Sequence, residues 1–181
     1  GEALIPGISV LLREAAENYG VQECVIGMAH RGRLNALVNI FKKPVRDLFS
    51  EFEGKDFEDD DIDGDVKYHL GLTLSKTYRN GHKIKMNLVP NPSHLETVAA
   101  VAEGITRAKI DRKYKGDSSK ILPIIIHGDA AIAGQGIAYE IVQMAKLNGY
   151  KTGETIHIVV NNQVGFTTNY LDARSSTYCT D

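Results

Sequence analysis

Apolar residues in the first third of the chain recur at helical spacing and then form a short continuous run. Between residues 4 and 18 they include Ile8, Leu11, Leu12, Ala15 and Ala16, a pattern that predicts a helix ending at Gly20. The run from Glu23 to Ala29 predicts a short buried strand. Two further helices are predicted, over 34–41 and from Pro44 to Phe52.

The middle of the chain combines an acidic segment, a hairpin and a long helix. Acidic residues dominate 53–65, where we expect a mobile solvated loop because like charges repel and little apolar surface is available for packing. Alternation over 83–88 predicts a half-exposed strand that pairs with 73–79 across Asn80-Gly81. Ser93 followed by Glu96 resembles a capping box and predicts a helix from there to about Tyr114.

The last third predicts a strand–helix–strand unit over 121–127, 135–148 and 155–160. Strands joined in this way lie parallel in one sheet. No repeat or linker divides the chain, so we expect residues 1–181 to form a single α/β domain. Its predicted fold is a mainly parallel sheet with helices on both faces.

The composition of the chain argues against several classes of function. The chain has 21 basic and 23 acidic residues, a balance that argues against non-specific nucleic-acid binding. It has neither an apolar run of membrane-spanning length nor a signal peptide, so we expect no membrane partner. Cys24 and Cys179 are far apart and fit a reducing, cytoplasmic setting. The abrupt first and last residues lead us to expect a piece of a longer protein.

Polar residues follow both strands of the strand–helix–strand unit. His127-Gly128-Asp129 comes after one apolar run, and Asn161-Asn162 comes after the next. Alone, the acid is typical of a helix cap and the amides of a turn, but parallel strands bring their carboxyl ends to one edge, where ligands bind. Carboxylate and amide oxygens suit Mg²⁺, and nearby glycines let the backbone approach a phosphate. The pattern predicts a metal–diphosphate site.

With these motifs in place, the sequence resembles the thiamine diphosphate-dependent decarboxylating components of 2-oxoglutarate dehydrogenase complexes. Thiamine enzymes share a Gly-Asp-Gly … Asn-Asn motif, and here Ala130 takes the place of its last glycine, as in the 2-oxoglutarate branch. The resemblance covers nearly the whole chain. It is carried by GMAHRGRLN (27–35), DVKYHLG (65–71), NPSHLE (91–96), HGDAAIAGQG (127–136), IHIVVNNQVGFTT (156–168) and ARSS (173–176).

The resemblance implies a thiamine diphosphate-binding fold, of which this chain holds the diphosphate domain, with roles for individual residues. Asp129 and Asn162 correspond to Mg²⁺ ligands, and Val164 to a ligand through its backbone carbonyl. His30 and His69 correspond to active-site histidines that meet the 2-oxo acid. The implied neighbours of thiamine diphosphate are Arg31, Ser93, Leu95, Ala130 and Ala131, together with Asp129 and Asn162.

The resemblance also implies the reaction of the whole enzyme. It is an oxidoreductase of the tricarboxylic acid cycle that decarboxylates 2-oxoglutarate and passes a succinyl unit to a lipoyl group on the dihydrolipoyl succinyltransferase component. The full-length protein is expected to be a homodimer. A glutamate that activates the cofactor is expected in a second domain outside these residues, so we expect the 181-residue chain alone to be inactive.

Three alternatives remain open from the sequence. A 2-oxoadipate dehydrogenase of the same family would differ by one methylene in its substrate. A non-catalytic α/β module could keep the fold, although it would most easily lose Asp129 or Asn162. A metallophosphatase-like hydrolase also uses Gly-Asp and Asn at strand ends, but it requires a histidine-rich metal shell, and the sequence lacks the Gly-Asp-x-His and Gly-Asn-His-Glu elements of such enzymes, so this alternative is the weakest.

Overall fold

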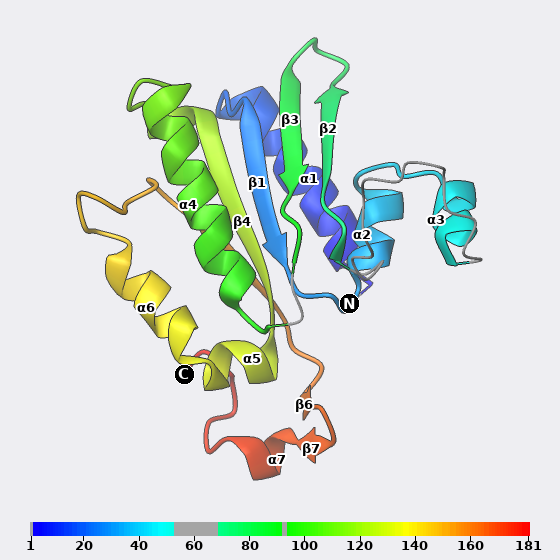
Figure 1. Ribbon diagram of the computed structural model, residues 1–181, viewed down its shortest axis with the longest axis vertical. Coiled ribbons are helices and arrows are strands. Elements are labelled where there is room, and N and C mark those ends of the chain that lie inside the picture. The colour runs from blue at the N-terminus through cyan, green and yellow to red at the C-terminus, as the bar shows by residue number, and fades with distance from the viewer. Residues whose placement is uncertain (1, 53–68, 92–93) are drawn as a thin grey trace, which may run out of the picture.

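A five-stranded sheet in the order β2–β3–β1–β4–β5 forms the centre of the molecule. The structure, a computed structural model, describes residues 2–52, 69–91 and 94–181, so the predicted acidic loop and Ser93 lie outside the described residues. Strands β1, β3, β4 and β5 run parallel, and β2 is antiparallel to β3, which confirms the mainly parallel sheet (Figure 1). The strands are β1 (Glu23–Met28), β2 (Leu72–Thr77), β3 (Lys83–Leu88), β4 (Ile121–Gly128) and β5 (Ile156–Val160).

Helices cover both faces of this sheet, as predicted. Figure 1 shows α4 in front of the sheet and α1 behind it. A short 3-10 turn, Ser118–Lys120, leads into β4. The helices are α1 (Leu4–Asn18), α2 (Arg33–Asn39), α3 (Val45–Phe52), α4 (Thr97–Arg112), α5 (Asp129–Gly134), α6 (Gly136–Met144) and α7 (Tyr170–Ala173).

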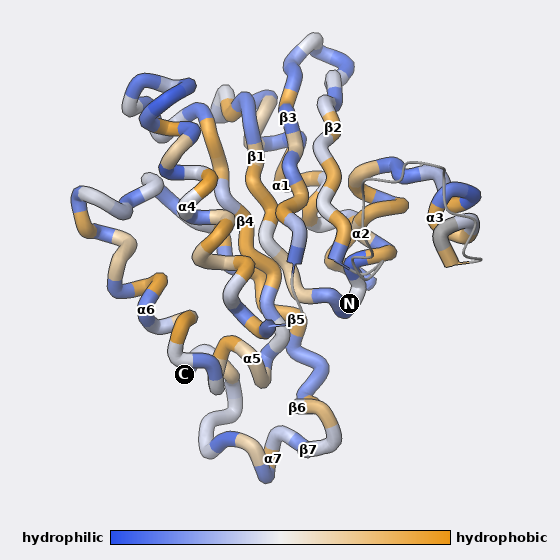
Figure 2. Tube along the Cα trace, viewed as in Figure 1, coloured by the Kyte–Doolittle hydropathy of each residue, from blue (hydrophilic) through white to orange (hydrophobic). Residues whose placement is uncertain are grey.

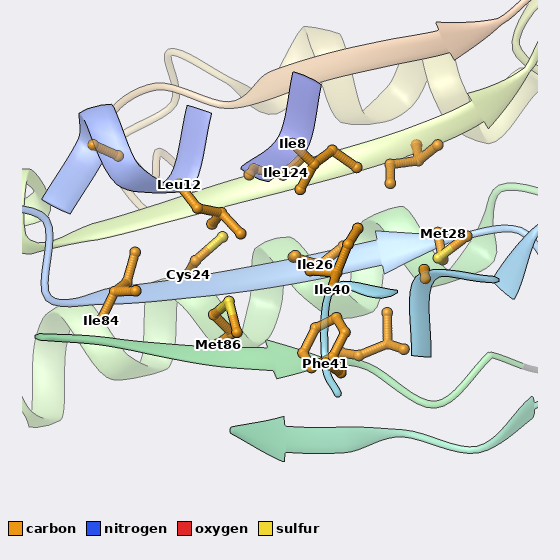
Figure 3. Packing of buried hydrophobic residues seen from close by; sticks show 14 of the residues in the cluster. Ile8, Leu12, Cys24, Ile26, Met28, Ile40, Phe41, Ile84, Met86 and Ile124 are labelled. Atoms are coloured by element: carbon orange, nitrogen blue, oxygen red, sulfur yellow. The ribbon is translucent and has the colours of Figure 1, made fainter. Parts of the chain in front are cut away.

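Alternation along the strands divides the core into two layers. Cys24, Ile26 and Met28 of β1 pack with α1 and α2 on one face, as Figure 3 shows, whereas Val25 packs with α4 on the other. All six residues of β1 are buried, which explains why the five residues after Glu23 form a continuous apolar run rather than an alternating one. In Figure 2 the hydrophobic colour accordingly follows β1 and β4, and the β2–β3 turn is hydrophilic.

The structure corrects the predicted boundaries of two helices. Helix α4 begins at Thr97 and ends at Arg112, not at Ser93 and Tyr114. The capping-box prediction is wrong because Glu96 itself precedes the helix with a left-handed φ of 67°. The predicted helix over 135–148 is shorter, since α6 ends at Met144.

A small unit that was not predicted lies beyond the carboxyl edge of the sheet. It consists of the two-stranded β6 (Val164–Gly165) and β7 (Thr168–Asn169), followed by α7. Figure 1 shows this unit next to α5, below the end of β4. Among the described residues no helix is both long and apolar enough to cross a membrane.

Candidate functional site

Asp129 lies where β4 ends and α5 begins. The register pairs Gly128 with Val160, so Asp129 and Asn161, the next residues, follow the ends of neighbouring strands at the carboxyl edge. The Asp129 side chain is only 2% exposed, and its Oδ2 accepts a hydrogen bond of 2.9 Å from Nη1 of Arg174. The two polar strand ends noted in the sequence are therefore neighbours in space.

The turn after β5 is fixed by its own asparagines. Asn161 Oδ1 accepts from the Gln163 backbone N at 3.2 Å, and Asn162 Oδ1 accepts from the Val164 backbone N at 3.1 Å. Such side-chain-to-backbone bonds are typical of asparagine turns and support the left-handed φ of 62° at Gln163. A Cβ at Gly165 would lie 3.0 Å from the Ala130 Cβ, so the turn packs closely against α5.

The donor set at this edge consists of oxygen atoms. The three predicted ligands, the Asp129 carboxylate, the Asn162 amide and the Val164 carbonyl, would supply oxygens of the kind that Mg²⁺ prefers. The Asn162 oxygen has a second lone pair besides the one that accepts from Val164. The described residues contain no cluster of three or more His, Cys, Asp or Glu that could hold a metal. The residues present fit a hard cation that keeps water and phosphate ligands.

Arg33 ties together the segments that carry His30 and His69. Its Nη1 donates to the Met28 carbonyl at 3.2 Å, just before the His30 loop. Its Nε and Nη2 donate to the Leu70 carbonyl at 3.1 and 2.8 Å, next to His69. His30 is exposed to solvent, whereas His69 is buried.

The Arg33 guanidinium is fully buried and also donates to the Val89 carbonyl. Burial lowers the pKa of Arg33 to about 10, a value that still leaves it charged at neutral pH. The His69 carbonyl accepts from the Asn91 N at 3.0 Å, which links the same rim to the segment before α4. Arg33, a cation of the GMAHRGRLN motif beside His30, is therefore a positioning residue, a role that its place in the sequence did not indicate.

His30 and Leu95 line one small cavity of about 10 Å³ together with Asn91, His94 and Glu96. The other expected cofactor neighbours are less closely grouped. Arg31 is exposed, Ala130 is half-buried and Ala131 is buried within α5.

A hydrogen-bonded chain runs behind this cavity. Glu96 Oε2 lies 2.5 Å from His127 Nδ1, and His127 Nε2 lies 2.8 Å from His157 Nδ1. The two imidazoles also stack, with ring centroids 5.1 Å apart. The pKa of His157 is lowered mainly by burial and, to a smaller extent, by the nearby His127. Glu96 thus orients the histidine two positions before Asp129 instead of capping α4.

Comparison with known proteins shows the family of the chain. A family model described as dehydrogenase E1 component matches residues 2–181. The 2-oxoglutarate dehydrogenase E1 component of Azotobacter vinelandii is 53% identical over 182 residues, which cover 100% of this chain and 19% of that protein. The mitochondrial 2-oxoglutarate dehydrogenase of Dictyostelium discoideum is 46% identical over 183 residues, 99% of this chain and 18% of that protein.

A third relative combines several functions in one chain. The multifunctional 2-oxoglutarate metabolism enzyme of Mycolicibacterium vanbaalenii is 50% identical over 185 residues, 99% of this chain and 15% of that protein. The chain therefore spans less than a fifth of the length of these relatives.

Proposed function

Because the chain belongs to the dehydrogenase E1 component family, we propose that it forms the Mg²⁺- and diphosphate-binding part of a thiamine diphosphate-dependent 2-oxo acid dehydrogenase. The observation that carries this proposal is the buried Asp129 beside the turn from Asn161 to Val164. Arg174 already pairs with Oδ2 of this buried carboxylate, and a hard cation could share the carboxylate with neutral oxygens from the turn.

Three oxygen donors would hold the cation in this proposal: the Asp129 carboxylate, the Asn162 amide and the Val164 carbonyl. When bound, the thiazolium of thiamine diphosphate supplies the electron sink that side chains lack for removing CO₂ from a 2-oxo acid. The residues proposed to contact the cofactor besides these ligands are Arg31, Ser93, Leu95, Ala130 and Ala131.

His30 and His69 are proposed to contact the substrate. His30 is exposed at the end of β1, and its loop is tied by Arg33 to the segment that carries His69. Neutral imidazoles can donate to a carboxylate or move a proton near neutral pH. Substitution of either histidine by Asn should raise KM for the 2-oxo acid while leaving cofactor affinity nearly unchanged.

For the whole protein, we infer oxidative decarboxylation of 2-oxoglutarate and transfer of a succinyl unit to a lipoyl group of a dihydrolipoyl succinyltransferase, by a homodimer. The names of the three relatives, all of which contain 2-oxoglutarate, support this substrate. 2-Oxoadipate is the competing substrate, and one methylene changes binding by about 1–3 kcal/mol. The ratio of kcat/KM for the two acids distinguishes them. The cytoplasmic location remains a prediction, since the Dictyostelium relative is named mitochondrial.

Calorimetric titration of the intact protein with Mg²⁺ and thiamine diphosphate tests the ligand assignment. Loss of a residue that only orients a metal ligand costs about 10–100-fold in metal affinity. Asp129 is proposed to bind the metal directly, so Asp129→Asn should weaken metal-dependent cofactor binding by more than about 100-fold. Asp172→Asn, at an exposed acid of α7, is the matched control and should bind normally. Tight binding by the Asp129 variant would refute the assignment of Asp129 as a ligand.

A further inference from the structure

Arg174 reaches back to the proposed cation ligand from the end of α7. Its backbone N donates to the Tyr170 carbonyl at 3.0 Å, and its guanidinium lies over the Tyr170 ring, 5.4 Å from the centroid. Its Nη1 donates to Asp129 Oδ2 at 2.9 Å. The segment from Asn161 to Arg174 therefore leaves the sheet beside Asp129 and returns to it.

Two of the three guanidinium nitrogens of Arg174 are buried without a hydrogen-bond partner among the described residues. The side chain is 9% exposed, and Nε and Nη2 have no hydrogen-bond partner among the described residues. Leaving charged donors buried and unpaired costs free energy, and the single bond to Asp129 satisfies only one nitrogen. An anion that accepted from the other two nitrogens would remove this cost.

The planar guanidinium matches phosphate oxygens, to which it can donate two parallel bonds. All its nitrogens lie within a few ångströms of Asp129 because one of them already contacts that carboxylate. A second anion there would be repelled by Asp129 unless a cation neutralised the carboxylate. The site therefore favours an anion that arrives with a divalent cation, as a diphosphate does.

We propose that Arg174 is a diphosphate-binding residue, whose Nε and Nη2 donate to a diphosphate oxygen once a divalent cation occupies Asp129. This inference rests on the proposed function of Asp129. The competing role is purely structural, with Arg174 only fastening the 161–174 segment to α5. If Arg174 had only that structural role, its substitution would disturb Asn162 and Val164 and so weaken cation binding as well.

The test measures cation and diphosphate binding separately in the intact protein. Mn²⁺ binding is followed by electron paramagnetic resonance, and inorganic pyrophosphate is then titrated at saturating Mn²⁺. For Arg174→Gln we expect pyrophosphate affinity to fall about tenfold or more, with Mn²⁺ affinity unchanged or higher because the competing ion pair is gone. Arg174→Lys, which keeps the charge but loses the planar fork, should lose part of the pyrophosphate affinity. Arg13→Gln, at an exposed arginine of α1, is the control.

Two results would overturn the role of Arg174: unchanged pyrophosphate affinity in the Gln variant, or a parallel fall in Mn²⁺ and pyrophosphate affinity. A fall in 2-oxoglutarate affinity with pyrophosphate affinity intact would also overturn it, by assigning the nitrogens to the substrate carboxylate. If the Gln variant does not fold, as judged by circular dichroism, the Lys variant carries the same test. Failure of the unsubstituted protein to bind Mn²⁺ would contradict the proposed function instead.

Discussion

Glu23 is the first residue of β1, and its carboxylate is buried beneath α4. It accepts hydrogen bonds from Lys109, from Lys113 at 2.6 Å and from the Tyr114 hydroxyl at 3.0 Å. Burial alone would raise the pKa of Glu23, but the bonds from the two lysines outweigh it and hold the pKa below the usual 4.5. Glu23 therefore joins the start of β1 to the last turn of α4.

We expect Glu23→Gln to lower the free energy of unfolding by about 1–2 kcal/mol at neutral pH, since the hydrogen bonds from two partly exposed lysines would lose their charged acceptor. Because the folded pKa is lowered, the contribution of Glu23 is present above 4.5 and lost as the pH falls through the folded value. Urea unfolding at pH 7 and at about pH 3 measures both effects. The difference in the free energy of unfolding between the variant and the unsubstituted protein should be smaller at the lower pH. Glu14→Gln, at an acid of α1 whose side chain is 46% exposed, should change stability by less than about 0.5 kcal/mol.

Individual site residues differed in how far the sequence could predict them. Asp129 and Asn162 could be singled out from the sequence because each lies within two residues of the end of an apolar strand, and parallel strands end at one edge. Arg174 and Glu96 were not, since their partners Asp129 and His127 lie 45 and 31 positions away along the chain. No local pattern encodes such long-range pairs. The sequence contained both residues inside recognised motifs but gave no sign of what they contact.

At the scale of elements, the strands and long helices follow from their apolar spacing, whereas the unit β6–β7–α7 does not. The residues of this unit are mostly exposed, so hydrophobic periodicity is absent there. Its shape comes from the asparagine turns, the packing of Gly165 on Ala130 and the return of Arg174 to Asp129. The start of α4 was mispredicted for a related reason, because Glu96 serves His127 rather than the helix.

The packing of α4 on β1 depends on a glycine that leaves room for the helix. A Cβ at Gly27 would lie 3.2 Å from Ala102 Cβ, Ile125 Cδ1 and the Val98 carbonyl. We expect Gly27→Ala to lower the free energy of unfolding by about 1–2 kcal/mol, because α4 and β4 must shift to accept the methyl group.

Gly104, within α4, is the matched control because a Cβ there would meet nothing within 4 Å. Gly104→Ala should instead stabilise the protein by about 0.5–1 kcal/mol through helix propensity. Denaturant titration of the two variants measures the difference between them. Equal stability changes would show that the close approach of α4 to β1 does not limit packing.

At the scale of the whole molecule, the proposed site residues line one wall rather than an enclosed pocket. The cavity beside His30 measures about 10 Å³, roughly the space of one water molecule. Ligand sites usually enclose about 300–1,000 Å³. Asn162, Val164 and Phe166 are exposed on the same rim, and β5 pairs on one side only among the described strands. In the proposed function, the described residues hold a cation and diphosphate along this wall without surrounding a cofactor.

We therefore expect residues 1–181 alone, supplied with Mg²⁺ and thiamine diphosphate, not to decarboxylate 2-oxoglutarate. Decarboxylation needs the reacting carbon shielded from water, and an open wall leaves it solvated. The resemblance also implies that the activating glutamate belongs to another domain. Ferricyanide reduction coupled to 2-oxoglutarate oxidation measures this, with the intact protein as the positive control and its Asp129→Asn variant as the negative one. Steady turnover by the 181 residues would mean that this single wall is sufficient for catalysis and that no second domain is required.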